Sequence, residues 1–114
     1  MKKNLSPRER DSLLLDLLHQ LMTEKITEGQ LLRHLRKKVL GLSQDQYAKL
    51  TGISRRTLSD LELGKGASSL KLLNGVFKPL GLQVGLLPRS SLLRRQLFET
   101  LEQPDPSPSG SLTS

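Results

Sequence analysis

The sequence predicts a mainly α-helical fold with one short β-strand near its C-terminal end. Leucines recur at helical spacing, as between Leu13 and Leu21, and this period favours amphipathic helices over alternating strands. Several stretches open with serine or threonine followed three residues later by glutamate or glutamine, at Ser6, Thr27 and Ser43. This spacing is the capping box of a helix start. At 114 residues, the chain is long enough for one domain with a modest core.

The first expected helix runs from Ser6 to about Lys25, after a loose basic arm at residues 1–5. Ser6 suits the N-cap position and Pro7 suits the first helical position. We expect its apolar stripe to pack on the chain's own core; the alternative is that the stripe docks a second subunit or another protein. The stripe consists of Leu13, Leu14, Leu17, Leu18 and Leu21.

The second expected helix follows Thr27 and carries a basic cluster near its C-terminal end, where cations are favoured by the helix dipole. This cluster consists of Arg33, Arg36, Lys37 and Lys38. The expected buried face of the same helix consists of Leu31, Leu32, Leu35 and Val39.

Residues 43–62 predict two short helices joined by a tight turn. Ser43 caps the first helix and Ser54 the second. Gly52 fits the turn, because a positive φ costs glycine little. The side chains spaced to fill the shared interior are Tyr47, Ile53, Leu58 and Leu61. This is the pattern of a helix-turn-helix, whose second helix enters the major groove of DNA.

A loop and a weakened helix are expected next. Gly64–Ser69 is predicted to be a plain connection, because its glycine spacing does not match a phosphate-binding loop. The helix Leu70–Leu80 contains Gly75 and Pro79, which predict a frayed or bent last turn before Gly81 ends it. Its partly buried side chains are expected to be Leu70, Leu72, Leu73, Val76, Phe77 and Leu80.

The segment Leu82–Leu87 is too short for another helix and is predicted to be the strand. The chain offers no second strand, so the backbone N–H and C=O groups of this one would lack partners. Antiparallel pairing with the same strand of a second copy across a two-fold axis supplies them, with Leu82, Val84 and Leu86 as dimerisation residues. The alternative is an extended segment packed on its own helices.

A final helix is expected at Leu92–Gln103, after the capping residues Ser90 and Ser91. Three roles are open for it: packing on the first helix, reinforcing a dimer, or docking a partner. From Pro104 onward, the proline- and serine-rich composition is typical of disorder.

Residues 28–88 resemble the Xre/Cro/CI repressor family, which is all-helical and binds DNA as a dimer. The family signature is matched in order by Gly41–Gln44, Ala48–Leu50, Gly52–Ser54, Thr57–Ser59 and Leu61–Gly64. The resemblance implies a lambda-repressor-like helix-turn-helix domain, to which this chain adds an N-terminal and a C-terminal helix.

Within that family, Gly81–Pro88 is most similar to the HipB-type branch. In that branch a C-terminal β-strand follows the helices, and the protein often accompanies a HipA-type kinase toxin. The resemblance favours intersubunit pairing of the strand. It also implies that Arg36 braces Glu62 rather than contacting DNA. Between Arg36 and Gly41 the chain has one residue more than many members, which we expect to lengthen the helix or the loop.

The candidate DNA contacts lie on and around the two helices of the motif. Gln44 resembles the family's glutamine that holds a phosphate or a base-reading side chain in place. Arginine makes bidentate bonds to guanine, so of Arg55 and Arg56 we expect one to read bases and the other to grip a phosphate. The hydroxyl residues have alternative roles as a helix cap or in local backbone bonding. The full set is Gln44, Ser54, Arg55, Arg56, Thr57, Ser59 and Lys65.

Composition supports a binding role and argues against catalysis. The net charge of +7 and pI near 10.2 indicate a polyanionic partner. The absence of cysteine excludes disulfides, thiolate metal sites and thiol nucleophiles, and it fits a reducing cytoplasm. His19 and His34 lie on separate expected helices without a ligand pattern, so we expect no enzyme activity, cofactor or metal. No apolar run approaches the ~20 residues that span a bilayer, and the start lacks the apolar region of a signal peptide.

We therefore expect four segments: an arm and extension helix at 1–26, a DNA-binding domain with its dimerisation strand at 27–89, a helix at 90–103 and a disordered tail at 104–114. The predicted function is sequence-specific repression in the cytoplasm, at the nucleoid, by a homodimer on a palindromic operator of double-stranded DNA. The resemblance extends this to the autoregulating antitoxin of a toxin–antitoxin operon. The alternatives are a protein-interaction module that inhibits or scaffolds a HipA-like kinase toxin, and a stand-alone Xre-family regulator.

Overall fold

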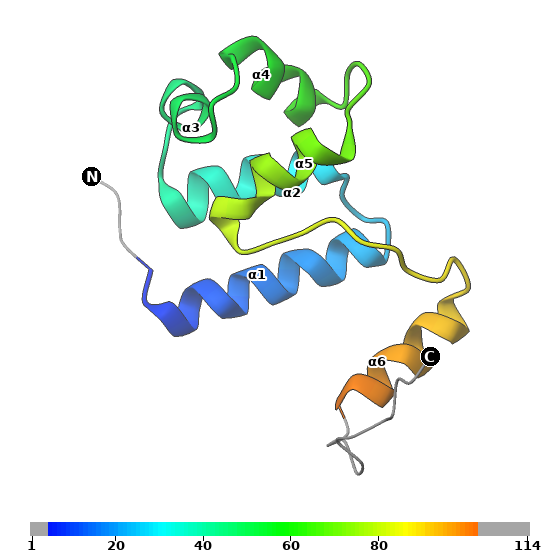
Figure 1. Cartoon of the computed structure of the whole chain (residues 1–114). Coiled ribbons are helices and arrows are strands. Elements are labelled where there is room, and N and C mark those ends of the chain that lie inside the picture. The colour runs from blue at the N-terminus through cyan, green and yellow to red at the C-terminus, as the bar shows by residue number, and fades with distance from the viewer. Residues whose placement is uncertain (1–4, 103–114) are drawn as a thin grey trace, which may run out of the picture. The chain divides into compact units, whose positions relative to one another are not determined.

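Helices dominate the structure, a computed structural model that describes residues 5–102 (Figure 1). These residues contain no β-strand. They divide into two compact units, one ending at Val84 and the other beginning at Gly85. The first unit contains α1 (Pro7–Met22), α2 (Glu28–Leu35), η1 (Arg36–Leu40), α3 (Gln44–Thr51), α4 (Arg55–Leu63), α5 (Leu70–Phe77) and η2 (Lys78–Leu80), and the second contains α6 (Ser91–Glu102).

Side-chain caps determine where α1, α2 and α3 begin. The hydroxyls of Ser6, Thr27 and Ser43 each accept the backbone N–H three residues further on, at 3.1 Å. In return, the glutamate or glutamine at that position accepts the N–H of the capping residue at 2.8 to 2.9 Å. The predicted capping boxes are therefore confirmed.

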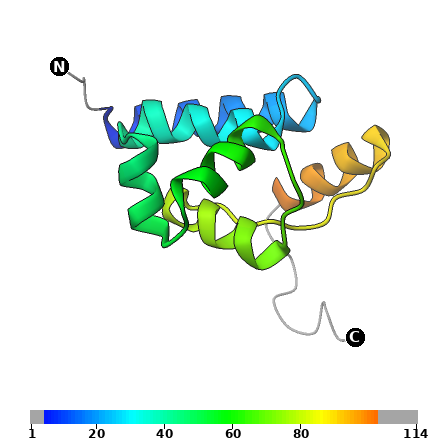
Figure 2. The same ribbon diagram turned by 90° about the horizontal axis from the view of Figure 1, so that it is seen from above.

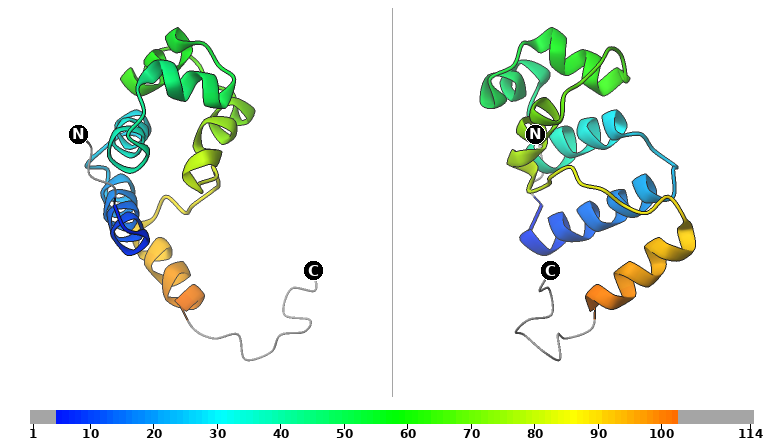
Figure 3. Two further views of the ribbon diagram at one scale, coloured as in Figure 1. Left: turned by 90° about the vertical axis from the view of Figure 1, so that its left-hand side faces the viewer. Right: turned by 45° about the vertical axis from the view of Figure 1, so that its right-hand side comes forward.

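The added helix α1 belongs to the core of the first unit. Leu17 is buried, and the other leucines of its stripe are partly buried against the core. Figures 1 and 3 show α2 between α1 and the α3–α4 pair. The expected packing of this stripe on the chain's own core is thus confirmed. The helix ends at Met22 rather than near Lys25, because Glu24 adopts a left-handed φ of 62° that a right-handed helix cannot include.

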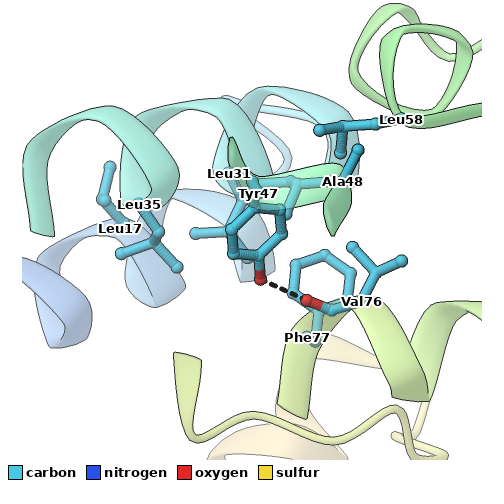
Figure 4. Packing of buried hydrophobic residues seen from close by; sticks show 9 residues of the cluster. Leu17, Leu31, Leu35, Tyr47, Ala48, Leu58, Val76 and Phe77 are labelled. Carbon is cyan, nitrogen blue, oxygen red and sulfur yellow. Dashed lines mark hydrogen bonds between the residues drawn. The ribbon is translucent and has the colours of Figure 1, made fainter. Parts of the chain in front are cut away.

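The core closes around Tyr47, the single tyrosine of the chain, which is fully buried. Its Oη donates a hydrogen bond to the carbonyl of Val76 and so links α3 to α5 (Figure 4). Burial raises the pKa of this phenol to about 12, and the negative charge of Glu62 adds to the shift. The other buried hydrophobic residues are Leu17, Leu31, Leu32, Leu35, Ala48, Leu58, Val76 and Phe77.

The extra residue before Gly41 is accommodated by a change of helix type. Arg36–Leu40 forms a π-helical turn directly after α2, and the N–H of Gly41 donates to the carbonyl of Arg36 five residues back. A π-turn holds one more residue than an α-turn. Gly41 then ends the turn with a φ of 65°. The sequence predicted that the extra residue would lengthen the helix or the loop. It instead widens the end of the helix into a π-turn.

The last core helix ends as predicted. α5 stops at Phe77, the chain continues as the short 3₁₀ segment η2 that contains Pro79, and Gly81 ends it with a φ of 76°. The predicted partial burial of Leu70 is wrong, because 66% of its surface is exposed. It stands at the first position of α5, beyond the reach of the core.

The predicted strand at Leu82–Leu87 is not formed, and residues 82–88 have no regular secondary structure. The physical reason is the missing partner, since residues 5–102 provide no strand with which to pair. Local bonds take over: the N–H of Leu82 donates to the carbonyl of Phe77 at 3.2 Å, and the N–H of Val84 donates to Oδ1 of Asn74 at 2.8 Å. Leu82 packs against the core, whereas Leu86 is fully exposed.

The second unit contains the expected final helix. The Ser90 hydroxyl accepts the N–H of Leu93 at 3.2 Å, so Ser90 caps α6 as predicted. Several leucines of α6 are exposed, namely Leu92, Leu93, Leu97 and Leu101. Residues 1–4 of the predicted arm, the last residue of the expected helix and the predicted tail from Pro104 lie outside the described residues.

Candidate nucleic-acid interface

The C-terminal end of α4 is held by a buried ion pair. Arg36 Nε donates to Glu62 Oε2 at 2.6 Å, and Arg36 Nη2 donates to Glu62 Oε1 at 3.0 Å. The two side chains are 7% and 3% exposed. Arg36 Nη1 also donates to the carbonyl of Leu42 at 2.8 Å. The expectation that Arg36 braces Glu62 is therefore confirmed, and its guanidinium is committed to the protein.

Gln44 joins this brace. It is the first residue of α3, and its Nε2 donates to Glu62 Oε1 at 3.0 Å. The Glu62 carboxylate therefore receives three hydrogen bonds, which offset the cost of burying its charge. The brace ties η1, the start of α3 and the end of α4 into one unit, and it fixes the direction in which α4 leaves the core.

A close backbone contact adds to this anchor. A Cβ atom built at Gly29 of α2 would lie 2.4 Å from the carbonyl oxygen of Leu61 and 2.5 Å from that of Glu62. Only glycine therefore lets α2 approach the end of α4 so closely. Sequence reasoning did not identify Gly29, since a glycine in the first turn of a helix carries no sign of the distant backbone it will meet.

The turn between α3 and α4 has the predicted geometry. Gly52 adopts a φ of 78°, and Figure 2 shows the two helices running in different directions on either side of it. Ser54 Oγ accepts the N–H of Thr57 at 3.0 Å and donates to Thr57 Oγ1 at 2.8 Å. The Ser54 hydroxyl therefore caps the start of α4, and the Thr57 hydroxyl is bonded to it. Ile53 and Leu61 are partly buried against the core, as expected for the interior of the motif.

The N-terminal end of α4 is open. Arg55 and Arg56 are the first two residues of the helix and both are exposed. Arg55 Nε lies 3.7 Å from Asp45 Oδ1 of α3, with both side chains 65% exposed. Such a solvated pair stabilises by at most about 1 kcal/mol, so a phosphate can replace the carboxylate at little cost.

The remaining predicted contacts lie at different distances from this open end. Ser59 follows Arg55 by one helical turn, so the two share a face of α4. Lys65 is exposed in the loop beyond α4, where its N–H donates to the carbonyl of Asp60 at 2.8 Å. The structure thus places most predicted contacts on α4 or at its ends, and Gln44 beside them on α3.

Residues 5–102 contain no group of histidines and carboxylates that could hold a metal ion. None of the helices from α1 to α6 is long and apolar enough to cross a bilayer.

Comparison with known proteins agrees with this geometry. The family model for the helix-turn-helix matches residues 32–87, which run from α2 to just beyond η2. Neither a curated protein nor a solved structure matches the chain significantly.

Proposed function

We propose that the protein is a sequence-specific transcriptional repressor that binds a palindromic operator as a dimer. The match of the helix-turn-helix family model to residues 32–87 supports a DNA-binding regulator. The observation that carries the proposal is the asymmetry of α4. Its C-terminal end is fixed by the buried Glu62, and its N-terminal end presents Arg55 and Arg56 to solvent.

The proposed mechanism is occlusion of a promoter by α4 lying in the major groove. Contacts to phosphates supply most of the affinity and register the protein on the duplex. One of Arg55 and Arg56 reads guanine through O6 and N7, and the other grips a phosphate. Gln44, Ser54, Thr57, Ser59 and Lys65 complete the proposed contact set.

Dimerisation is the second part of the proposal. A palindrome presents its half-sites about 34 Å apart, which demands two recognition helices in a fixed relation. The exposed apolar residues Val84 and Leu86, with Leu82 beside them, are the proposed dimer contacts. Sedimentation should show that Leu86→Asp converts dimers to monomers, whereas Leu15→Asp on the exposed side of α1 leaves the dimer intact. A dimeric Leu86→Asp protein would remove this contact from the proposal.

The proposed repressor autoregulates a toxin–antitoxin operon in the manner of HipB-like antitoxins and acts at the nucleoid in the cytoplasm. The exposed leucines of α6 support an alternative function that depends on binding another protein. These leucines are Leu93, Leu97 and Leu101. In that alternative the chain is an interaction module that inhibits or scaffolds a HipA-like kinase toxin. A stand-alone Xre-family regulator is the third form. A kinase reading frame beside the gene separates the antitoxin from the stand-alone regulator.

Gel shifts with the DNA upstream of the protein's own reading frame test the central proposal. We expect nanomolar binding by the wild type and its loss in the Arg55→Ala/Arg56→Ala double variant. Lys38→Gln is the control, because it removes one exposed cation of η1 that is not among the proposed contacts. Weak binding that is blind to sequence and unchanged in the double variant would favour the interaction module.

A further inference from the structure

A small polar hollow lies beside the face of α4 that carries Arg55 and Ser59. Its volume is about 280 Å³, and α2, η1, α3 and α4 all contribute to its wall. The residues that line it are Arg33, Arg36, Gln44, Ser59, Glu62 and Leu63. Two of the predicted DNA contacts, Gln44 and Ser59, therefore share this hollow with Arg33. Arg33 was predicted only to belong to the basic cluster of its helix, not to contact DNA.

The charges of the hollow leave one cation uncompensated. Arg36 and Glu62 neutralise each other in the buried pair, and Gln44 is bonded to the same carboxylate. Arg33 is exposed, and within residues 5–102 its guanidinium has neither an ion-pair nor a hydrogen-bond partner. The Ser59 hydroxyl likewise has no partner in that part of the chain. A free guanidinium and a free hydroxyl thus meet at a hollow of net positive charge.

We propose that this hollow binds a phosphodiester group of the DNA backbone, with Arg33 as the anchoring cation and Ser59 as a second donor. A guanidinium offers a planar fork of N–H donors that matches two phosphate oxygens. The inference rests on the proposed function, because the phosphate comes from a duplex whose major groove holds α4.

Two features of the site make a phosphate a better occupant than a base edge. Arg33 belongs to α2, not to the helix that enters the groove, so it stands beside the duplex where the backbone passes. Gln44 is held by the brace, so the wall of the hollow is fixed before DNA arrives. A fixed wall lowers the ordering cost of binding. Arg33 therefore extends the DNA interface to a helix outside the two-helix motif.

The test is fluorescence anisotropy with the upstream duplex over a series of salt concentrations. Each phosphate contact contributes about 0.9 to the slope of log affinity against log salt, so Arg33→Gln should reduce the slope by about 0.9. Its affinity should fall by about tenfold. The fall should be equal for operator and unrelated DNA, because a phosphate contact carries no sequence information. Arg33→Lys should keep the slope, and Lys38→Gln should match the wild type.

The outcomes separate this inference from the proposed function. An unchanged slope in Arg33→Gln, with DNA binding otherwise intact, would overturn the phosphate site and leave the repressor proposal standing. An equal loss in Arg33→Gln and Lys38→Gln would also overturn it, because it would indicate a diffuse field in place of a contact. Failure of the wild type to bind any duplex would overturn both. Thermal melts should show that Arg33→Gln folds normally, since this side chain is exposed.

Discussion

The two ends of α4 are built in opposite ways. At the C-terminal end, Glu62 is buried, receives three hydrogen bonds, and lies against the backbone of α2 at Gly29. At the N-terminal end, Arg55 and Arg56 are exposed, and one long solvated ion pair with Asp45 is the ionic contact there. The difference teaches that the helix is fixed where it meets its own protein and left open where a partner can reach it.

The largest expected effect comes from removing the buried cation. Arg36→Ala leaves Glu62 buried without its counter-charge, which should lower the free energy of unfolding by about 3–5 kcal/mol. Urea denaturation followed by circular dichroism measures this loss. A loss below about 1 kcal/mol would mean that the end of α4 does not depend on the ion pair, and the contrast between the two ends would disappear.

The next effect tests the close contact between α2 and α4. Gly29→Ala places a Cβ against two backbone carbonyls, which cannot rotate away as a side chain would. The overpacking should cost about 1–3 kcal/mol. Gly75→Ala is the matched control: its Cβ meets nothing within 4 Å, so α5 should gain about 1 kcal/mol from the better helix former. Equal effects in the two variants would show that α2 and α4 can separate freely.

Tyr47→Phe tests whether the rigid part of the fold that holds the C-terminal end of α4 extends through α3 to α5. The variant leaves the buried carbonyl of Val76 without its donor, at a cost of about 1–2 kcal/mol at neutral pH. The wild type should also lose stability at alkaline pH. Its folded state raises the phenol pKa to about 12, so the unfolded chain, which ionises near pH 10.0, releases the proton first.

That alkaline loss has a defined window. The contribution of Tyr47 to stability is complete below about pH 10 and declines as the pH rises toward about 12. Comparing denaturation of the wild type and Tyr47→Phe between neutral and alkaline pH isolates it, because all other titrating groups are shared. Parallel curves for the two proteins would contradict the role assigned to this phenol.

The smallest effect on stability belongs to the open end. Arg55→Gln breaks an ion pair between side chains that are both 65% exposed, so the unfolding free energy should change by less than about 0.5 kcal/mol. DNA affinity should nevertheless fall strongly in the same variant. A large loss of stability would show that this arginine supports the fold, and the two ends of α4 would no longer differ.

Local features of the fold could be predicted from the sequence. The capping boxes at Ser6, Thr27 and Ser43 and the glycine turn at Gly52 involve residues at most a few positions apart, so their pattern is visible in the chain. The pairing of Arg36 with Glu62 spans 26 positions and came from a family resemblance, not from spacing.

The remaining features depend on neighbours that are distant in sequence. Gly29 matters only because the end of α4 arrives beside it. The π-turn at Arg36–Leu40 lies between the buried Arg36 and Leu42, which packs against the core. Leu82–Leu87 has the composition of a strand but no partner strand in the described chain. Within the candidate site, the sequence predicted the arginines of α4 as DNA contacts. The hollow at Arg33 could not be predicted, because its wall forms only when α2, η1, α3 and α4 come together in space.

The position of Tyr47 has a practical consequence. The chain has no tryptophan and no other tyrosine, so its intrinsic ultraviolet emission originates almost entirely from one phenol at the centre of the domain. A change in that emission upon mixing with a ligand would therefore report a rearrangement inside the protein, and a silent signal during tight binding would identify a rigid body that docks without repacking. Tyr47 can therefore serve as an intrinsic fluorescent probe, with no added label.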